Sequence, residues 1–142
     1  MRPRLRKENS GRKKIMNRTP IIYLEKIMPD QPPEDDEGNR EYKLKIIPQD
    51  ECEWEQRCIK LATQLKYRLG EGCGKALYLL GVRDKGQAVG IDKLSLLITI
   101  TMIEEAVQHI EETTINNIRL YRGTNGHIAT MRLSNPRLAE VW

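Results

Sequence analysis

Residues 61–91 have the sequence LATQLKYRLGEGCGKALYLLGVRDKGQAVGI, and this stretch decides the fold. Its leucines first recur at helical spacing, which predicts an amphipathic helix that ends where Gly70 supplies a left-handed conformation. The apolar run 75–81, bounded by glycines, then predicts a buried strand. After the turn at 83–86, residues 87–91 are predicted to form a second strand, antiparallel to the first.

The segment before this stretch supplies a further strand and the start of the helix. Apolar and charged residues alternate over 41–47, which is the period of a strand with one buried face. Asp50 and Glu53 have the spacing of a capping box at the start of a helix. The apolar stripe that follows predicts that this helix runs to about Leu69.

The segment after this stretch adds a second helix and a hairpin. Asp92 is a plausible cap for a helix over residues 93–112, although the β-branched residues inside it also fit a strand by propensity. Residues 115–121 and 127–133 are predicted to be strands joined by a turn at 123–126. The expected fold is therefore α+β: a mixed five-stranded sheet with two helices packed on one face, in the order β-α-β-β-α-β-β.

The chain divides into three parts by composition. Residues 1–40 are expected to hold a disordered basic arm, an apolar patch at 21–28 that docks as an extended segment, and the acidic, proline-rich linker 29–38. Residues 41–134 form the predicted α+β domain. Residues 135–142 are predicted to be a short C-terminal tail.

The charge of the chain is concentrated at its start. Residues 1–18 hold eight basic side chains against one acid, a net +7, while the other 124 residues hold sixteen against nineteen, a net −3. A flexible arm of this kind is expected to bind RNA, because each phosphate that it neutralises releases counterions. A nuclear localisation signal or a solubilising tail remains the alternative interpretation. The predicted RNA-binding residues are Arg2, Arg4, Arg6, Lys7, Arg12, Lys13, Lys14 and Arg18.

The sequence argues against metal, secretory and membrane-spanning classes. It has three cysteines without Cys-x-x-Cys spacing and two histidines far from them, so we expect no metal site and reduced thiols in the cytosol or nucleus. The start of the chain lacks the apolar region of a secretory signal, and it has too few apolar groups for a good mitochondrial transit helix. The longest apolar run, 94–103, is too short to cross a bilayer.

Nucleotide binding and catalysis are not expected either. The glycine-rich segment 70–75 leads from a helix into a strand, whereas a phosphate-binding loop leads from a strand into a helix whose first amides face the phosphates. We therefore interpret it as a structural turn. No nucleophile, base and orienting acid can be assembled around His109 or His127. The expected protein is not an enzyme and uses no cofactor.

A family resemblance runs from roughly residue 37 to residue 141. Its densest segments are 61–69, 71–74 and 78–82, followed by Asp84, Gly86, Gly90 and Ile91, with residues 37–39 and 41–45 at its start. In this order and spacing they resemble the N-terminal domain of the GTP-binding protein 1 and 2 family, which are relatives of translation elongation factors.

The resemblance implies a cytoplasmic protein linked to translation and mRNA surveillance. Residues 138–141 resemble the approach to the GTPase domain of that family, which lies beyond the end of this sequence, so no residue here inherits GTP binding. The chain is then either a fragment of a longer protein or an accessory domain kept without the GTPase. Its start at Met1 with a basic arm favours a complete small protein.

These observations predict a non-enzymatic, ribosome-binding factor associated with translation, of inhibitory or dormancy (hibernation) type. Its basic arm is expected to contact rRNA while its body docks on rRNA or a ribosomal protein, with no membrane or small-molecule partner. The alternative is a regulatory N-terminal domain or fragment of a translational GTPase that acts through protein contacts. A nuclear RNA-processing accessory protein is a third interpretation.

Overall fold

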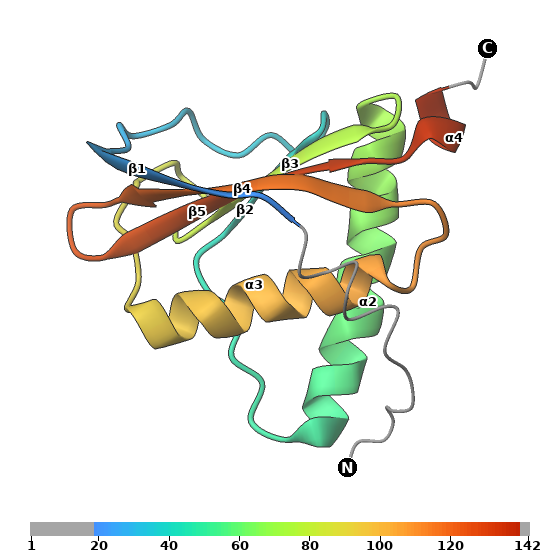
Figure 1. Ribbon diagram of the computed structural model, residues 1–142, viewed down its shortest axis with the longest axis horizontal. Coiled ribbons are helices and arrows are strands. Elements are labelled where there is room, and N and C mark those ends of the chain that lie inside the picture. The colour runs from blue at the N-terminus through green and yellow to red at the C-terminus, as the bar shows by residue number, and fades with distance from the viewer. Residues whose placement is uncertain (1–18, 140–142) are drawn as a thin grey trace.

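Five strands form one mixed sheet in the order β1-β4-β5-β3-β2. The computed structural model describes residues 19–139 of the chain (Figure 1). The β1–β4 and β2–β3 pairs are parallel, whereas β3 and β4 each pair antiparallel with β5. The strands are β1 (Ile21–Ile27), β2 (Arg40–Lys43), β3 (Lys75–Leu80), β4 (Thr114–Arg122) and β5 (His127–Ser134).

Two long helices cover one face of this sheet (Figure 1). Both begin at an aspartate that satisfies a free backbone amide: the carboxylate of Asp50 accepts from the Glu53 amide at 2.8 Å, and that of Asp92 accepts from the Ser95 amide at 3.0 Å. The capping residues expected from the sequence are therefore confirmed. The helices are α2 (Glu51–Glu71), α3 (Lys93–Val107) and the short α4 (Pro136–Ala139).

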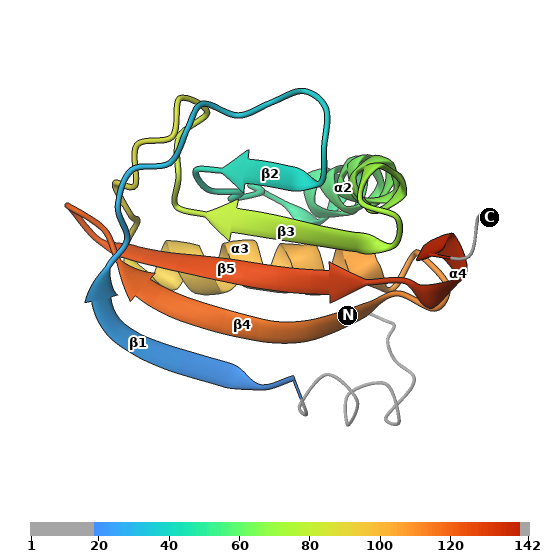
Figure 2. The ribbon, with the colours of Figure 1, turned by 90° about the horizontal axis from the view of Figure 1, so that it is seen from above.

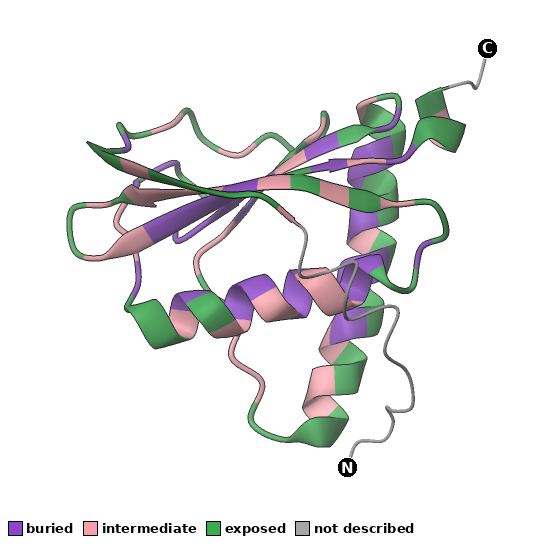
Figure 3. Cartoon of the chain, viewed as in Figure 1, coloured by how far each residue is buried: buried purple, intermediate pink, exposed green. Residues whose placement is uncertain are grey.

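The main core lies between these helices and the sheet. Leu65 and Leu69 of α2 and Ile103 of α3 are almost fully buried, and they pack against sheet residues such as Tyr78 and Met131. Buried positions follow the inner side of each helix and the central strands, whereas β1 is largely exposed (Figure 3). Burial of this apolar face holds the helices on the sheet.

A second, smaller apolar cluster lies on the opposite face of the sheet. There the chain between β1 and β2 crosses the ends of the strands and then runs beside β2 (Figure 2). Gln31 donates its backbone amide to Gly86 at 2.8 Å, and the Glu34 amide donates to Asp84 at 2.7 Å. The cluster consists of Met28, Tyr42, Leu79, Val82, Ala88 and Ile128.

The predicted fold class is confirmed, but the predicted order of elements is wrong at one strand. Residues 87–91 form no regular strand and do not pair with β3, because β2 and β5 already occupy both edges of β3. They bond instead to the β4–β5 turn, where Ala88 and Val89 accept from the amides of Thr124 and Asn125. The fifth strand is β1, so the observed order of the main elements is β-β-α-β-α-β-β.

Three boundaries also differ from the sequence predictions. Helix α2 continues through Gly70 to Glu71, and the left-handed conformations fall at Cys73 and Gly74, with φ of 52° and 95°. Helix α3 ends at Val107, short of the expected residue 112. Strand β2 covers only the first part of the expected 41–47 strand.

Composition predicted that residues 21–39 lie outside the α+β domain, but in the structure they pack against it. The apolar patch does dock as an extended segment, since β1 pairs in parallel with β4. In the described part of the chain, no helix is both long and apolar enough to cross a membrane.

Candidate nucleic-acid interface

The predicted RNA-binding residues all lie in 1–18, outside the described residues. The structure does show where this basic arm joins the body. The first described residues, Thr19 and Pro20, lead directly into β1, and the Pro20 carbonyl accepts a hydrogen bond from the Ile118 amide at 2.9 Å. The arm therefore leaves the body from the edge of the sheet that β1 forms.

The acidic segment 34–38 is held in place by Arg68 of α2. This side chain is only 4% exposed, and its Nε donates to the buried Glu41 carboxylate at 2.8 Å. The other guanidinium nitrogens donate to the carbonyls of Gly38 at 2.8 Å and Asp35 at 2.9 Å. The expected linker is thus fixed against the body, because one buried cation bonds to two of its backbone carbonyls and to Glu41.

Glu34 closes the outer edge of β2. Its carboxylate accepts a hydrogen bond from the Tyr42 amide at 2.6 Å, and the Tyr42 hydroxyl donates to the Pro32 carbonyl at 2.8 Å. Burial, with a contribution from the nearby Glu41 carboxylate, raises the pKa of Glu34 above its ordinary value. The β2 edge of the sheet therefore presents a covered and acidic border.

The opposite edge of the sheet is apolar and open. Among the described strands β1 pairs only with β4, and several of its large side chains face solvent: Ile21 is 51% exposed, Tyr23 74% and Ile27 62%. An exposed apolar group of this kind is typical of surfaces that contact a partner.

The side chains most suited to catalysis do not come together. His109 is exposed just beyond α3, whereas His127 is the first residue of β5. Burial and the Glu105 carboxylate raise the pKa of the Cys58 thiol to about 11, so this thiol stays protonated at neutral pH. Among the described residues, no three His, Cys, Asp or Glu side chains gather as a metal site.

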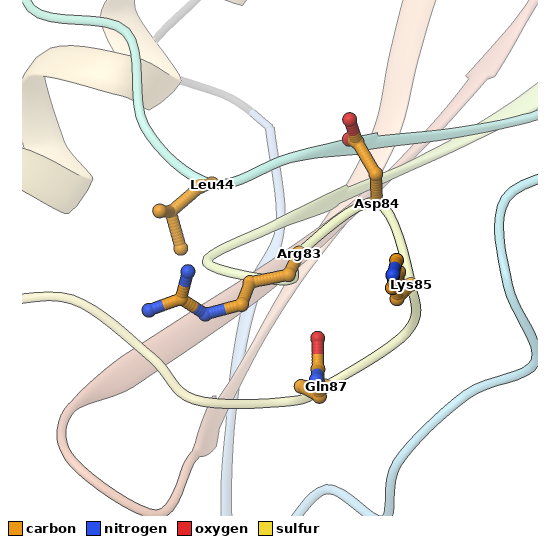
Figure 4. Close-up of a pocket in the computed structure, with 5 residues that line it drawn as sticks. All are labelled: Leu44, Arg83, Asp84, Lys85 and Gln87. Carbon is orange, nitrogen blue, oxygen red and sulfur yellow. The ribbon is translucent and has the colours of Figure 1, made fainter.

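A surface hollow of about 480 Å³ lies beside the loop that follows β3 (Figure 4). In it the Arg83 side chain extends beneath Leu44. The loop residues are exposed and carry charges of both signs, which is typical of a solvated loop. The hollow is lined by Leu44, Arg83, Asp84, Lys85 and Gln87.

The comparisons with known proteins agree with the resemblance in the sequence. Over 60 residues the chain is 47% identical to GTP-binding protein 2 of Mus musculus, and equally to GTP-binding protein 2 of Homo sapiens. Part of this chain is related to GTP-binding protein 2. The matched segment covers 42% of the chain but only 9% of either relative, so its place as an N-terminal accessory domain stays a prediction.

Two further comparisons find no match. No protein-family model matches the sequence, and no solved structure is similar to it. The related segment and the geometry of the described residues are therefore the basis for a functional proposal.

The sequence analysis missed the role of Arg68, although a signal for it was present. Arg68 lies three residues after Leu65 and seven after Leu61, so it falls on the buried face of α2. A charged residue on that face requires a buried partner, and the acidic segment 34–37 was the available one.

Proposed function

We propose that this protein is a non-enzymatic, cytoplasmic factor that binds the ribosome, with its basic arm contacting rRNA. The charge separation carries this proposal: a net +7 in residues 1–18 is joined to a body of net −3. A clustered positive charge on one side of a molecule attracts a polyanion over a long range. The relation to GTP-binding protein 2, whose family resembles elongation factors, directs the choice of polyanion to the ribosome.

Its action is proposed to be inhibitory, as in a dormancy factor. A factor that occupies a site used by translation factors blocks that site for as long as it stays bound.

Sedimentation of native lysate through sucrose gradients tests ribosome binding. At low salt the protein should sediment with ribosomes, and at high salt it should move to the top of the gradient, because phosphate contacts weaken with salt. Recovery only at the top of the gradient at low salt would contradict the proposal.

A second candidate is a regulatory domain that acts on a GTPase through protein contacts. The exposed apolar side chains of β1 favour it, since such groups are typical of protein interfaces. This candidate predicts association that survives high salt and is lost when Tyr23 and Ile27 are both changed to serine. The ribosome proposal predicts that association is lost at high salt and is retained in the double serine variant.

A further inference from the structure

The face of the sheet that the helices leave uncovered carries cross-strand rows of polar and basic side chains. The register places Arg40 beside Leu77, Leu77 beside Arg132, and Arg132 beside Asn117. Leu77 belongs to the apolar cluster on the uncovered side, so all of this row faces away from the helices. Figure 2 looks onto this side, where the middle of β3, β5 and β4 is open to view.

Two neighbouring rows lie on the same face. In one of them Thr130, 6% exposed, lies between the buried Leu79 and Arg119, so this row reaches the surface only at Arg119 and at Ile22 of β1, which lies beside it. On the other side of the first row, Lys75 and Ser134 are paired. The open face therefore presents four cations on adjacent strands, which are Arg40, Lys75, Arg119 and Arg132.

These cations are available for a partner. Within the described residues none of the four forms an ion pair. The Arg119 Nε and the Asn117 Oδ1 are shielded from solvent and have no hydrogen-bond partner in that part of the chain. An unsatisfied polar group costs free energy, so a ligand that allows these side chains to turn outward and pair is favoured.

No acidic side chain shares the paired rows of this face. The described strands contain only two acids, Glu25 and Glu41. Glu41 pairs with Tyr78 on the helix side, and Glu25 lies in the irregular part of the β1–β4 pairing, between Tyr23 and Ile27. The body is acidic overall, yet this face has a local excess of positive charge.

The point where the basic arm joins the body and the acidic segment lie at opposite borders of this face. The arm joins the body at Pro20, next to the pairing of Ile21 with Ile118 and one residue from the Arg119 row. The acidic segment lies beside β2, where Glu34 contacts the Tyr42 amide. A polyanion on the face therefore meets positive charge from Arg40 of β2 to Arg119 and the arm, whereas the segment beyond β2 is acidic.

We propose that the open sheet face is a second RNA-binding surface, on which Arg119 and Arg132 bind the phosphates of a strand that continues onto the basic arm. This inference rests on the proposed function and deepens it, because it gives the body its own contact with rRNA. Arginine suits such a site, since its planar group donates two parallel hydrogen bonds to a phosphate.

RNA fits this face better than an acidic protein does. Protein interfaces are anchored by large apolar or aromatic side chains in pockets. The row from Arg40 to Asn117 instead has amide and guanidinium groups around the half-buried Leu77. Its charges also continue into an arm whose composition suits phosphates.

Fluorescence anisotropy with a labelled single-stranded oligouridylate tests the proposal on the full-length chain. The double variant Arg119→Gln/Arg132→Gln should bind about ten-fold more weakly at low salt, and its salt slope should fall by about 1.4, at about 0.7 per lost phosphate contact. The same double substitution is also made in a chain whose eight arm cations are changed to Gln. The difference between the wild-type and the substituted face in that chain gives the contribution of the face to RNA affinity.

Two control variants separate this effect from net charge and from misfolding. Lys60→Gln/Lys66→Gln removes the same charge from exposed positions of α2, on the side of the sheet away from the proposed surface, and it should leave affinity and slope nearly unchanged. Arg119→Lys/Arg132→Lys keeps the charge and should retain most of the salt slope. If Arg119→Gln/Arg132→Gln and Lys60→Gln/Lys66→Gln change the RNA affinity and the salt slope equally, the proposal is overturned.

The results distinguish this inference from the proposed function. Ribosome sedimentation with no specific effect of the face variant would overturn the sheet-face surface and leave the arm proposal standing. Loss of RNA affinity in the face variant without any ribosome sedimentation would support the surface and overturn ribosome binding. Polyglutamate that binds the wild-type chain as tightly as the oligouridylate, with the same loss in the variant, would overturn the assignment to RNA.

Discussion

Arg68 is the residue that most strongly ties the acidic segment to the body. Its substitution by alanine would leave the buried Glu41 carboxylate without its closest partner and the carbonyls of Asp35 and Gly38 without donors. Breaking a buried ion pair from one side typically costs about 3–5 kcal/mol, so Arg68→Ala should lower the free energy of unfolding by about 3 kcal/mol or more.

Urea unfolding measures this change, with Arg57→Ala as the matched control. Arg57 lies on the same helix and pairs with Glu53 at 3.8 Å, but both side chains are about 40% exposed. An exposed pair contributes about 0–1 kcal/mol, so the control should change stability little. Equal effects of the two substitutions would show that the buried contact does not hold the segment.

Strand β1 illustrates how an element with exposed side chains is still part of the fold. Met28 follows its last residue, Ile27. The Met28 amide donates to the Arg122 carbonyl at 2.9 Å, and its side chain, 7% exposed, belongs to the second apolar cluster. Met28→Ala should therefore cost about 2–3 kcal/mol through lost burial and the cavity that remains.

The neighbouring Ile27 provides the control for this prediction. It is 62% exposed, so Ile27→Ala should change the free energy of unfolding by only about 0.5 kcal/mol. Thermal or urea unfolding of both variants checks the difference. If Met28→Ala were as mild as Ile27→Ala, residues 21–28 would not be a structural part of the body.

The elements that the sequence predicted well are those whose signal is local. Both helix caps and the β4–β5 turn depend on residues a few positions apart, and all three were found. The strand expected at 87–91 failed for a non-local reason, because the edges of β3 belong to β2 and β5. Likewise, the residues that pair with β1 lie 95 to 97 positions away, and periodicity cannot reveal them.

At the scale of the whole molecule, the sequence predicted a charged arm but not the surface beside it. The arm is visible because its eight cations lie within the first eighteen residues of the chain. Arg119 and Arg132 are thirteen positions apart, and only the register of β4 and β5 places them in neighbouring rows of one face. Their shared face therefore requires the sheet topology, as does the placement of the acidic segment at the opposite border.

We expect the whole molecule to divide ribosome binding between the arm and the body. With all eight arm cations changed to Gln, the salt slope of ribosome binding should become shallower. If half of the arm charges contact single-stranded rRNA, the slope should change by about 2.8, at about 0.7 per phosphate. Sedimentation at a series of salt concentrations measures this slope.

The stability of the body should not change in this variant, because the two apolar clusters consist of residues between Met28 and Leu133. Urea unfolding therefore serves as the control that the variant is folded. The body, at net −3, cannot supply the same attraction except through its local open face. An arm variant that keeps the wild-type affinity and salt slope would assign residues 1–18 to localisation and leave ribosome contact to the body.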